Sequence, residues 1–129
     1  MEFRSFLDTY INTWIQSSLT DLRNMISEDY QAREISGGQI IDFGYEESIK
    51  GWEQGFTYVL ENQAEWKIHE VSTIPLREDE VMAVLEATLV IDGKSLHTAN
   101  LFFQTFKKRD DNNWKLVRSY IEAGIQKNR

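Results

Sequence analysis

The chain has 129 residues, of which 41% are hydrophobic and 27% charged, values typical of one globular domain. It carries 14 basic and 21 acidic side chains, and a net charge of −7 without a Lys/Arg cluster argues against nucleic acid or an anionic membrane as a partner. The absence of cysteine excludes disulfides, thiol catalysis and cysteine metal sites. We therefore expect one cytoplasmic domain spanning residues 1–129.

The N-terminal residues do not have the pattern of a targeting segment. The stretch from Met1 to Phe6 contains no basic run followed by an apolar block, so we expect no signal peptide. No apolar run approaches the roughly 20 residues that a membrane-spanning helix needs. We expect no association with a membrane.

The first half of the chain shows helical periodicity twice before its first strands and once after them. Apolar residues at helical spacing predict a helix over about residues 2–16, and a second helix follows Ser17 or Ser18 and runs through Ile26. Short strands are expected over 30–35 and 39–43, around the Gly37-Gly38 turn. A third helix is expected over 46–60, because Ile49, Trp52, Phe56, Val59 and Leu60 share one side.

The second half reads as strands. We expect them over 66–76, 81–91, 96–106 and 114–121, with turns at Asp92-Gly93 and over 107–113. Helices first and a run of antiparallel strands last is typical of an α+β fold in which the helices cover one face of a sheet.

The late strands do not alternate cleanly between apolar and polar residues. The stretches 84–91 and 101–103 are nearly continuously apolar, whereas an antiparallel sheet with one wet face should alternate. Three helices can cover one face, and nothing else in a chain of this length can cover the other. We therefore predict a homodimer formed through the sheet face.

The element order, with Trp114 opening the last strand, resembles the nuclear transport factor 2-like superfamily. The shared marks are Asp92-Gly93 between strands, the polar turn before Trp114 and the run from Trp114 to Ile121. The sequence is most similar to the branch with SnoaL-like polyketide cyclases and the association domain of calcium/calmodulin-dependent kinase. The resemblance implies a cystatin-like cone, a curved antiparallel sheet wrapped around three N-terminal helices, with a pocket inside.

The register of the kinase association domain implies which strand residues face that pocket. It places toward the pocket Met82, Val84, Glu86, Thr88, Val90, Thr98, Asn100, Phe102, Gln104, Phe106, Val117, Ser119 and Ile121. It places on the dimer face Leu85, Ala87, Leu89, Ala99, Leu101, Phe103, Leu116, Arg118 and Tyr120. A shift of one residue in any strand would exchange its two sets.

Two carboxylates are candidate catalytic groups. Glu86 lies among apolar neighbours, where lost hydration would raise its pKa and suit it to general acid or base work. It could equally form an ion pair with Arg118 or Lys115. Asp42 lies near the position at which ketosteroid isomerase-like relatives carry a carboxylate base, although it could simply cap the turn before the third helix.

Six further residues are candidate ligand contacts: Tyr10, Trp14, Asn100, Phe102, Gln104 and Ser119. Tyr10 and Trp14 lie on consecutive turns of the first helix and could close the pocket or serve as core. Asn100 and Gln104 share a strand face, and each can both donate and accept hydrogen bonds. They could orient a ligand or satisfy Glu86.

The sequence predicts neither a metal nor a cofactor. His69 and His97 are the only histidines, and a zinc site would need carboxylates to complete it. No catalytic triad, glycine-rich phosphate loop or HExxH helix is present. SnoaL-like cyclases use an Asp/His pair, and many small relatives carry a late histidine where this chain has Arg118 and Tyr120.

Three functional hypotheses remain open. In the first, the chain is a homodimer that binds a small, mostly apolar molecule. Alternatively, it is a cofactor-free lyase, isomerase or cyclase that uses a pocket carboxylate. A third reading is an assembly module whose cone is filled by its own aromatic side chains.

Overall fold

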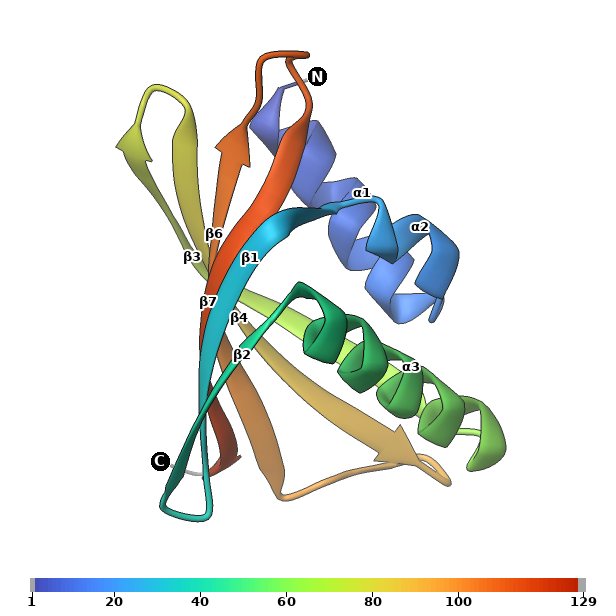
Figure 1. Ribbon diagram of the computed structural model, residues 1–129. Helices are drawn as coiled ribbons and strands as arrows, with labels where there is room; N and C mark the ends of the chain where they lie inside the picture. Colours follow the sequence, from blue (N-terminus) through green and yellow to red (C-terminus); the bar gives the residue numbers. More distant parts are fainter. Residues whose placement is uncertain (1, 128–129) are drawn as a thin grey trace.

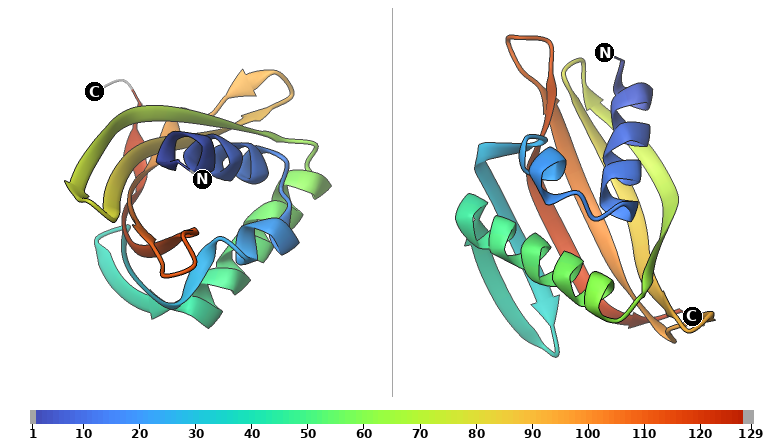
Figure 2. Two further views of the ribbon diagram at one scale, coloured as in Figure 1. Left: turned by 90° about the horizontal axis from the view of Figure 1, so that it is seen from above. Right: turned by 90° about the vertical axis from the view of Figure 1, so that its right-hand side faces the viewer.

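The computed structural model describes residues 2–127, which form three helices and a seven-stranded sheet. The elements are α1 (Phe3–Ile15), α2 (Leu19–Arg23), β1 (Ile26–Ser36), β2 (Gln39–Gly44), α3 (Tyr45–Glu61), β3 (Glu65–Arg77), β4 (Glu80–Ile91), β5 (Lys94–Ser95), β6 (Thr98–Lys108) and β7 (Trp114–Gln126). The helices lie together on one side of the sheet (Figure 1). Viewed from above, the sheet curls around α1 (Figure 2). The predicted α+β class and the cone are confirmed.

The sheet has the order β2-β1-β7-β6-β4-β3, with β5 paired to β4. All neighbours are antiparallel except β1 and β7, which run parallel. The predicted continuation of the second helix through Ile26 is wrong, because α2 ends at Arg23 and Ile26 begins β1. There Ile26 pairs with Leu116, and the carbonyl of Met25 accepts a hydrogen bond from the Leu116 amide (2.8 Å). Tertiary pairing overrides the local helical spacing.

Residues that lie opposite each other on paired strands share one face of the sheet, and they form transverse rows. One inner row runs Ala83, Gln104, Ser119, Ala32, Phe43 across β4, β6, β7, β1 and β2. The next inner row runs Leu85, Phe102, Ile121, Glu34, Ile41. These two rows form the concave wall that faces the helices.

The rows correct the predicted faces of β4. Leu85 pairs with Phe102 and belongs to the core, so Leu85, Ala87 and Leu89 point inward and Met82, Val84, Glu86, Thr88 and Val90 point outward. The prediction had the inner side of β6 right and was one residue out of phase on β4. The near-continuous apolar run of β4 does not show which alternate residues face inward, because Val84 on the outer face and Leu85 on the inner face are both buried.

A bulge shifts the register of β7. Thr105 pairs with Arg118 but the next residue, Phe106, pairs with Leu116, which leaves Val117 as the extra residue. Leu116 is therefore fully buried in the core rather than on the outer face as predicted. Beyond the bulge, Ser119 and Ile121 point inward as predicted.

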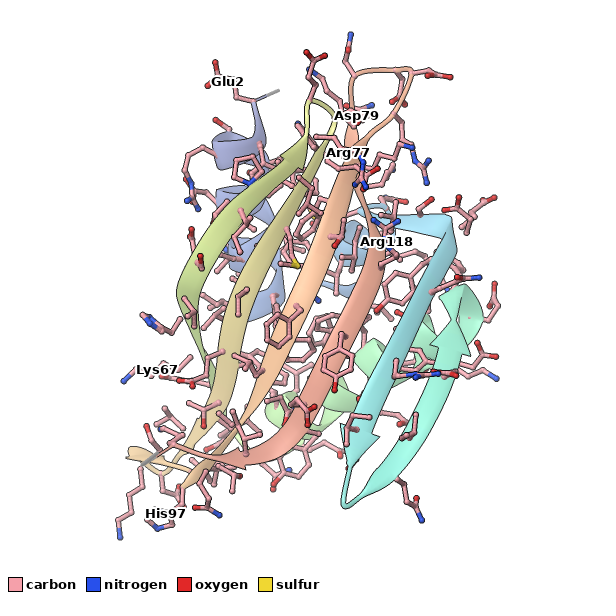
Figure 3. All side chains as sticks on the ribbon, turned by 90° about the vertical axis from the view of Figure 1, so that its left-hand side faces the viewer. Glu2, Lys67, Arg77, Asp79, His97 and Arg118 are labelled. Carbon is pink, nitrogen blue, oxygen red and sulfur yellow. The ribbon has the colours of Figure 1, made fainter. Side chains whose placement is uncertain are left out.

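The outer face carries an ion-pair cluster at one end. Arg118 and Arg77 lie near each other there (Figure 3), and both bond the Glu80 carboxylate, at 2.8 and 3.3 Å. The Glu80 side chain is 10% exposed, and its hydrogen bond from Arg118 holds the pKa of the carboxyl below its usual range. Arg118 therefore pairs with Glu80, not with Glu86 as the sequence reading allowed.

Aromatic side chains fill one end of the cone. Phe6 and Tyr10 are stacked with ring centroids 6.3 Å apart, and Phe106 meets both edge-on at 5.5 and 5.1 Å, arrangements that aromatic pairs favour. Arg4 ties α1 to the edge strand β3 through bonds of 2.8 and 2.9 Å to Glu70. The packed rings leave no room for a ligand at this end of the cone, so we look for a site toward its opposite, open end.

Candidate functional site

A cavity of about 520 Å³ lies between the concave wall of the sheet, α1 and α3. Its lining residues are Trp14, Tyr30, Glu34, Ile41, Asp42, Phe43, Glu47, Ser48, Gly51, Trp52, Gly55, Trp66, Asn100, Phe102, Gln104 and Ile121. The volume falls within the range typical of small-molecule pockets. Two glycines of α3 leave room for it: a Cβ at Gly51 would meet no atom within 4 Å, and one at Gly55 would lie 3.7 Å from Trp66.

Aromatic rings form the deep wall of this cavity. Trp14 packs edge-on against Trp52 and Phe102, with ring centroids 4.8 and 4.9 Å away, and against Trp66 at 6.0 Å. Trp52 and Phe102 are nearly parallel at 6.4 Å. Trp66 is anchored by a hydrogen bond from its Nε1 to Ser17 Oγ (3.2 Å). The contacts fix the rings from several elements, so the wall is formed before any ligand arrives.

Buried polar atoms without hydrogen-bond partners interrupt the apolar wall. Trp14 Nε1 and Gln104 Oε1 are of this kind, and both side chains line the cavity while being only 1% exposed. A buried polar atom without a partner costs about 1–3 kcal/mol. A ligand that supplies a donor to Gln104 and an acceptor to Trp14 would recover that cost.

Four tyrosine and serine hydroxyls lie in or just behind the wall of the cavity. Burial raises the pKa of Tyr30 to about 12, and the nearby hydroxyls of Ser119 and Ser48 partly oppose this rise. Burial likewise raises the pKa of Tyr10 well above its usual value, with a smaller effect from Tyr30 and a partial offset from the Gln104 amide. Both phenols therefore stay neutral at ordinary pH, and neither is suited to act as a general base.

Carboxylates mark the mouth of the cavity, and their environments differ. Asp42 is exposed and paired with Arg33 through bonds of 2.7 and 2.9 Å, which lower its pKa. Glu47 accepts a hydrogen bond from the Gly44 amide at the start of α3 (2.8 Å), which also lowers its pKa. Glu34 is partly buried on the inner face of β1, and burial raises its pKa.

Most of the predicted ligand contacts meet at this cavity. Trp14, Phe102 and Gln104 line its interior, and Asn100 lines it while its Oδ1 accepts a hydrogen bond from the Gly124 amide (2.9 Å). Tyr10 lies in the core behind Gln104, and Ser119 is buried beside Tyr30. These two stand one layer back from the lining.

The two predicted catalytic carboxylates do not meet there. Glu86 pairs with Leu101 and His69 on the outer face, so its predicted position inside the pocket is wrong. Its neighbours Leu85 and Ala87 on the inner face and Val84 on the outer face are all apolar and buried, and that pattern does not show which side Glu86 takes. Asp42 reaches the rim, but it lies opposite Arg33 on the outer side of the β1–β2 hairpin and its carboxylate is engaged there.

The residues missed by sequence reasoning are Glu34, Tyr30, Trp52 and Trp66. Trp52 and Trp66 looked like ordinary core positions of a helix and a strand. Tyr30, Ala32 and Glu34 do alternate with Gln31 and Arg33, and that period of two was the available signal for an inward-facing glutamate. The sequence could not show that Glu34 would stand in one row with Phe102.

A second hollow of about 1070 Å³ follows β1, β7 and β6 on the outer side. Both arginines of its lining are already paired, Arg33 with Asp42 and Arg118 with Glu80, and Asp29 is paired with Arg109 (2.8 Å). Of the unpartnered buried atoms in residues 2–127, only Ser119 Oγ belongs to a residue of this lining, whereas Trp14 and Gln104 line the smaller cavity alone, so we place the candidate site in the smaller one.

No three His, Cys, Asp or Glu side chains within residues 2–127 lie close enough together to hold a metal ion. Over the same residues, no helix is both long and apolar enough to cross a membrane.

Comparison with protein-family models and with curated proteins finds no match. Solved structures do match. An NTF2-like protein with a cystatin-like fold from Novosphingobium aromaticivorans superposes with a TM-score of 0.70 at 14% identity, over 95% of this chain and 79% of the other. An NTF2-like protein of unknown function from Shewanella oneidensis gives 0.67 at 18% identity, over 92% and 93%.

The kinase-associated branch is also represented. A protein named as a calcium/calmodulin-dependent protein kinase type II association domain, from Thiobacillus denitrificans, superposes with a TM-score of 0.69 at 15% identity, over 90% of each chain. The chain thus has the NTF2-like, cystatin-like fold that its sequence resembles. At these identities the likeness concerns the fold alone, and the fold does not specify a function.

Proposed function

We propose that the chain is a small soluble pocket protein that binds a mostly apolar organic molecule in the cavity between the sheet, α1 and α3. The observation that carries this proposal is the aromatic wall interrupted by two unpartnered buried polar atoms, Trp14 Nε1 and Gln104 Oε1. Apolar walls with a few fixed polar groups are the usual construction of a ligand site. Tyr10 and Phe106 fill the other end of the cone, so the cavity is not simply unfilled core.

Native mass spectrometry of protein purified from its own host tests this proposal. We expect a non-covalent adduct whose mass gives the ligand class. A Gly51→Leu variant should lose the adduct, because its side chain would enter the space beside Gly51, and a Lys50→Leu variant should keep it. An adduct that persists in Gly51→Leu, or a cavity that binds no apolar probe when the purified protein is empty, would contradict the proposal.

We also propose that two copies associate through the outer face of the sheet. The side chains of Val84, Leu101, Phe103 and Tyr120 give this face an apolar centre that the helices do not cover, and Phe103 packs edge-on against Tyr120 at 5.9 Å. Burial of such a surface is the main favourable term in most protein associations. Light scattering during size-exclusion chromatography should give twice the mass of the chain.

The second candidate function is a cofactor-free lyase, isomerase or cyclase. The observation that favours it is the raised pKa of Glu34, a partly buried carboxylate at the cavity, since a poised carboxylate is a suitable general base. Ring opening of a nitrobenzisoxazole, in which a base removes a carbon-bound proton as the N–O bond breaks, reports such a base. Catalysis that is lost in Glu34→Gln but kept in Asp42→Asn would support the enzyme; no rate above that of acetate buffer would oppose it.

A further inference from the structure

The charges at the cavity are all of one sign. Its lining, as far as residues 2–127 are described, contains the carboxylates Glu34, Asp42 and Glu47 but no Lys, Arg or His. Two of these carboxylates accept hydrogen bonds from groups of the protein: Asp42 from the Arg33 guanidinium and Glu47 from the Gly44 amide. The Glu34 carboxylate makes no ion pair or hydrogen bond with any other residue of the described chain, 2–127.

Glu34 is placed where its charge is costly. It stands on the concave wall between Ile121 and Ile41, and two strands away in the same row is Phe102. Burial among such neighbours disfavours a carboxylate, and the raised pKa of Glu34 reflects this. A positive charge close by would offset that cost, and within residues 2–127 no Lys, Arg or His lines the cavity.

Other residues that line the cavity with Glu34 suit a cation in two further ways. The faces of tryptophan rings attract cations through the ring quadrupole, and Trp14, Trp52 and Trp66 meet at the wall of the same cavity. Gln104 presents an unpartnered carbonyl oxygen, 1% exposed, one row deeper than Glu34. An ammonium group, or another N–H of the same ligand, can donate to it.

Building on the binding function proposed above, we infer that the ligand is an organic cation: a primary to quaternary amine with an apolar or aromatic body. The ammonium group lies between Glu34 and the tryptophan rings, and the apolar body packs toward Phe102. The unpartnered Trp14 Nε1–H favours a ligand that also carries an acceptor, such as a hydroxyl or ether oxygen. Anionic ligands are disfavoured by the Glu34 carboxylate, whose charge no neighbouring residue among 2–127 offsets.

Three probes with one phenyl body separate charge from shape: 2-phenylethylamine, 2-phenylethanol and phenylacetate. Each is titrated into the intact chain while the indole N–H signals of the tryptophans are followed by NMR. We expect the amine to bind about tenfold more tightly than the alcohol, and the carboxylate to bind most weakly. The indole signals of Trp14 and Trp52 should shift with the amine.

Matched variants locate the effect. Glu34→Gln should bring the amine to the affinity of the alcohol and leave the alcohol unchanged, whereas Glu28→Gln, with the same charge change on an exposed part of β1, should keep the tenfold preference. Trp52→Leu should weaken the amine more than the alcohol, and Tyr58→Leu on the exposed side of α3 should change neither.

The outcomes distinguish this inference from the function on which it rests. If amine and alcohol bind equally, or phenylacetate binds best, the cation assignment is wrong and the pocket function stands. A preference for the amine that survives Glu34→Gln also overturns the assignment, because the attraction then comes from elsewhere. If no phenyl probe shifts the indole signals, both the pocket function and the cation assignment fail.

Discussion

Glu34 on β1 and Phe102 on β6 lie in one transverse row of the sheet, separated by Ile121 of β7. The row exists because β1 runs parallel to β7 and β6 runs antiparallel to it, so that residues 68 positions apart in sequence share one wall. Its consequence is a carboxylate held at an aromatic cavity without a positive partner of its own among residues 2–127.

Glu34→Gln should stabilise the ligand-free protein at neutral pH. A carboxyl whose pKa is raised on folding contributes stability that is complete below its unfolded pKa, about 4.3, and is lost as pH rises through the folded value. The variant should therefore gain less than about 1 kcal/mol at pH 7, because the side chain is only partly buried. Urea unfolding from about pH 3.5, roughly one unit below the unfolded pKa of glutamate, up to about pH 7.5 measures the gain.

The neighbours of Glu34 do not blur this titration. The pKa of Tyr30 is raised to about 12, and the pKa values of Asp42 and Glu47 are lowered. None of these three groups therefore changes its protonation in the range above the unfolded pKa of glutamate, where Glu34 does. The difference between wild type and Glu34→Gln should vanish at the acidic end. A variant that is less stable at pH 7 would show that Glu34 has a structural partner.

Gly51 on α3 offers a separate test of the cavity. Gly51→Ala should raise the free energy of unfolding by about 0.5–1 kcal/mol, because alanine loses less conformational entropy in a helix and its Cβ meets no atom within 4 Å. Gly51→Leu should remain folded and exclude the phenyl probes. Chemical denaturation and probe titration check the two variants, and a destabilising Gly51→Ala would show that the space is already occupied.

Glu80 should make the protein sensitive to acid. Its pKa is lowered by Arg118 and Arg77, so its contribution to stability is present above the unfolded pKa and is lost as pH falls through the folded value. Glu80→Gln should cost about 1 kcal/mol at pH 7, a modest figure because both arginines are more than half exposed.

The same unfolding measurements at lower pH complete that test. The cost of Glu80→Gln should shrink as pH falls, since the wild-type carboxyl is then protonated too. Glu78→Gln, in the exposed turn before β4, is the control and should be neutral throughout. A cost that does not change with pH would assign the loss to packing instead of charge.

Phe103→Glu should separate the two copies. The substitution places a charge at the centre of the outer apolar face, beside Tyr120, and charged groups are depleted from the cores of such interfaces. We expect the molar mass measured by light scattering to fall from that of the proposed dimer to that of one chain, with helical content unchanged. Leu60→Glu, at an apolar position on α3 that is 70% exposed, should leave the mass unaltered; a dimeric Phe103→Glu would place the interface elsewhere.

Much of the fold could be read from local patterns. The spacing of Phe6, Tyr10 and Trp14 predicts α1, and the Asp92-Gly93 turn separates strands because both residues take a positive φ there. The parallel pairing of β1 with β7 was missed, because Ser27 to Asp29 looks like a helix end when Leu116 is not in view. Local chemistry sets an element, whereas pairing depends on the whole chain.

By itself, the sequence determined the α+β class and the helix and strand order, since these depend on periodicity and on short-range turn chemistry, and it gave two rings of the aromatic wall, Trp14 and Phe102. Only the tertiary structure decided which carboxylate faces the cavity. On β4, residues on both faces are buried, so the hydrophobic pattern does not distinguish inner from outer residues. From the sequence alone, Glu86 could be placed on either side. Glu34 faces inward because the pairings of β1 with β7 and β2 fix its row, and that is a property of strands distant in sequence.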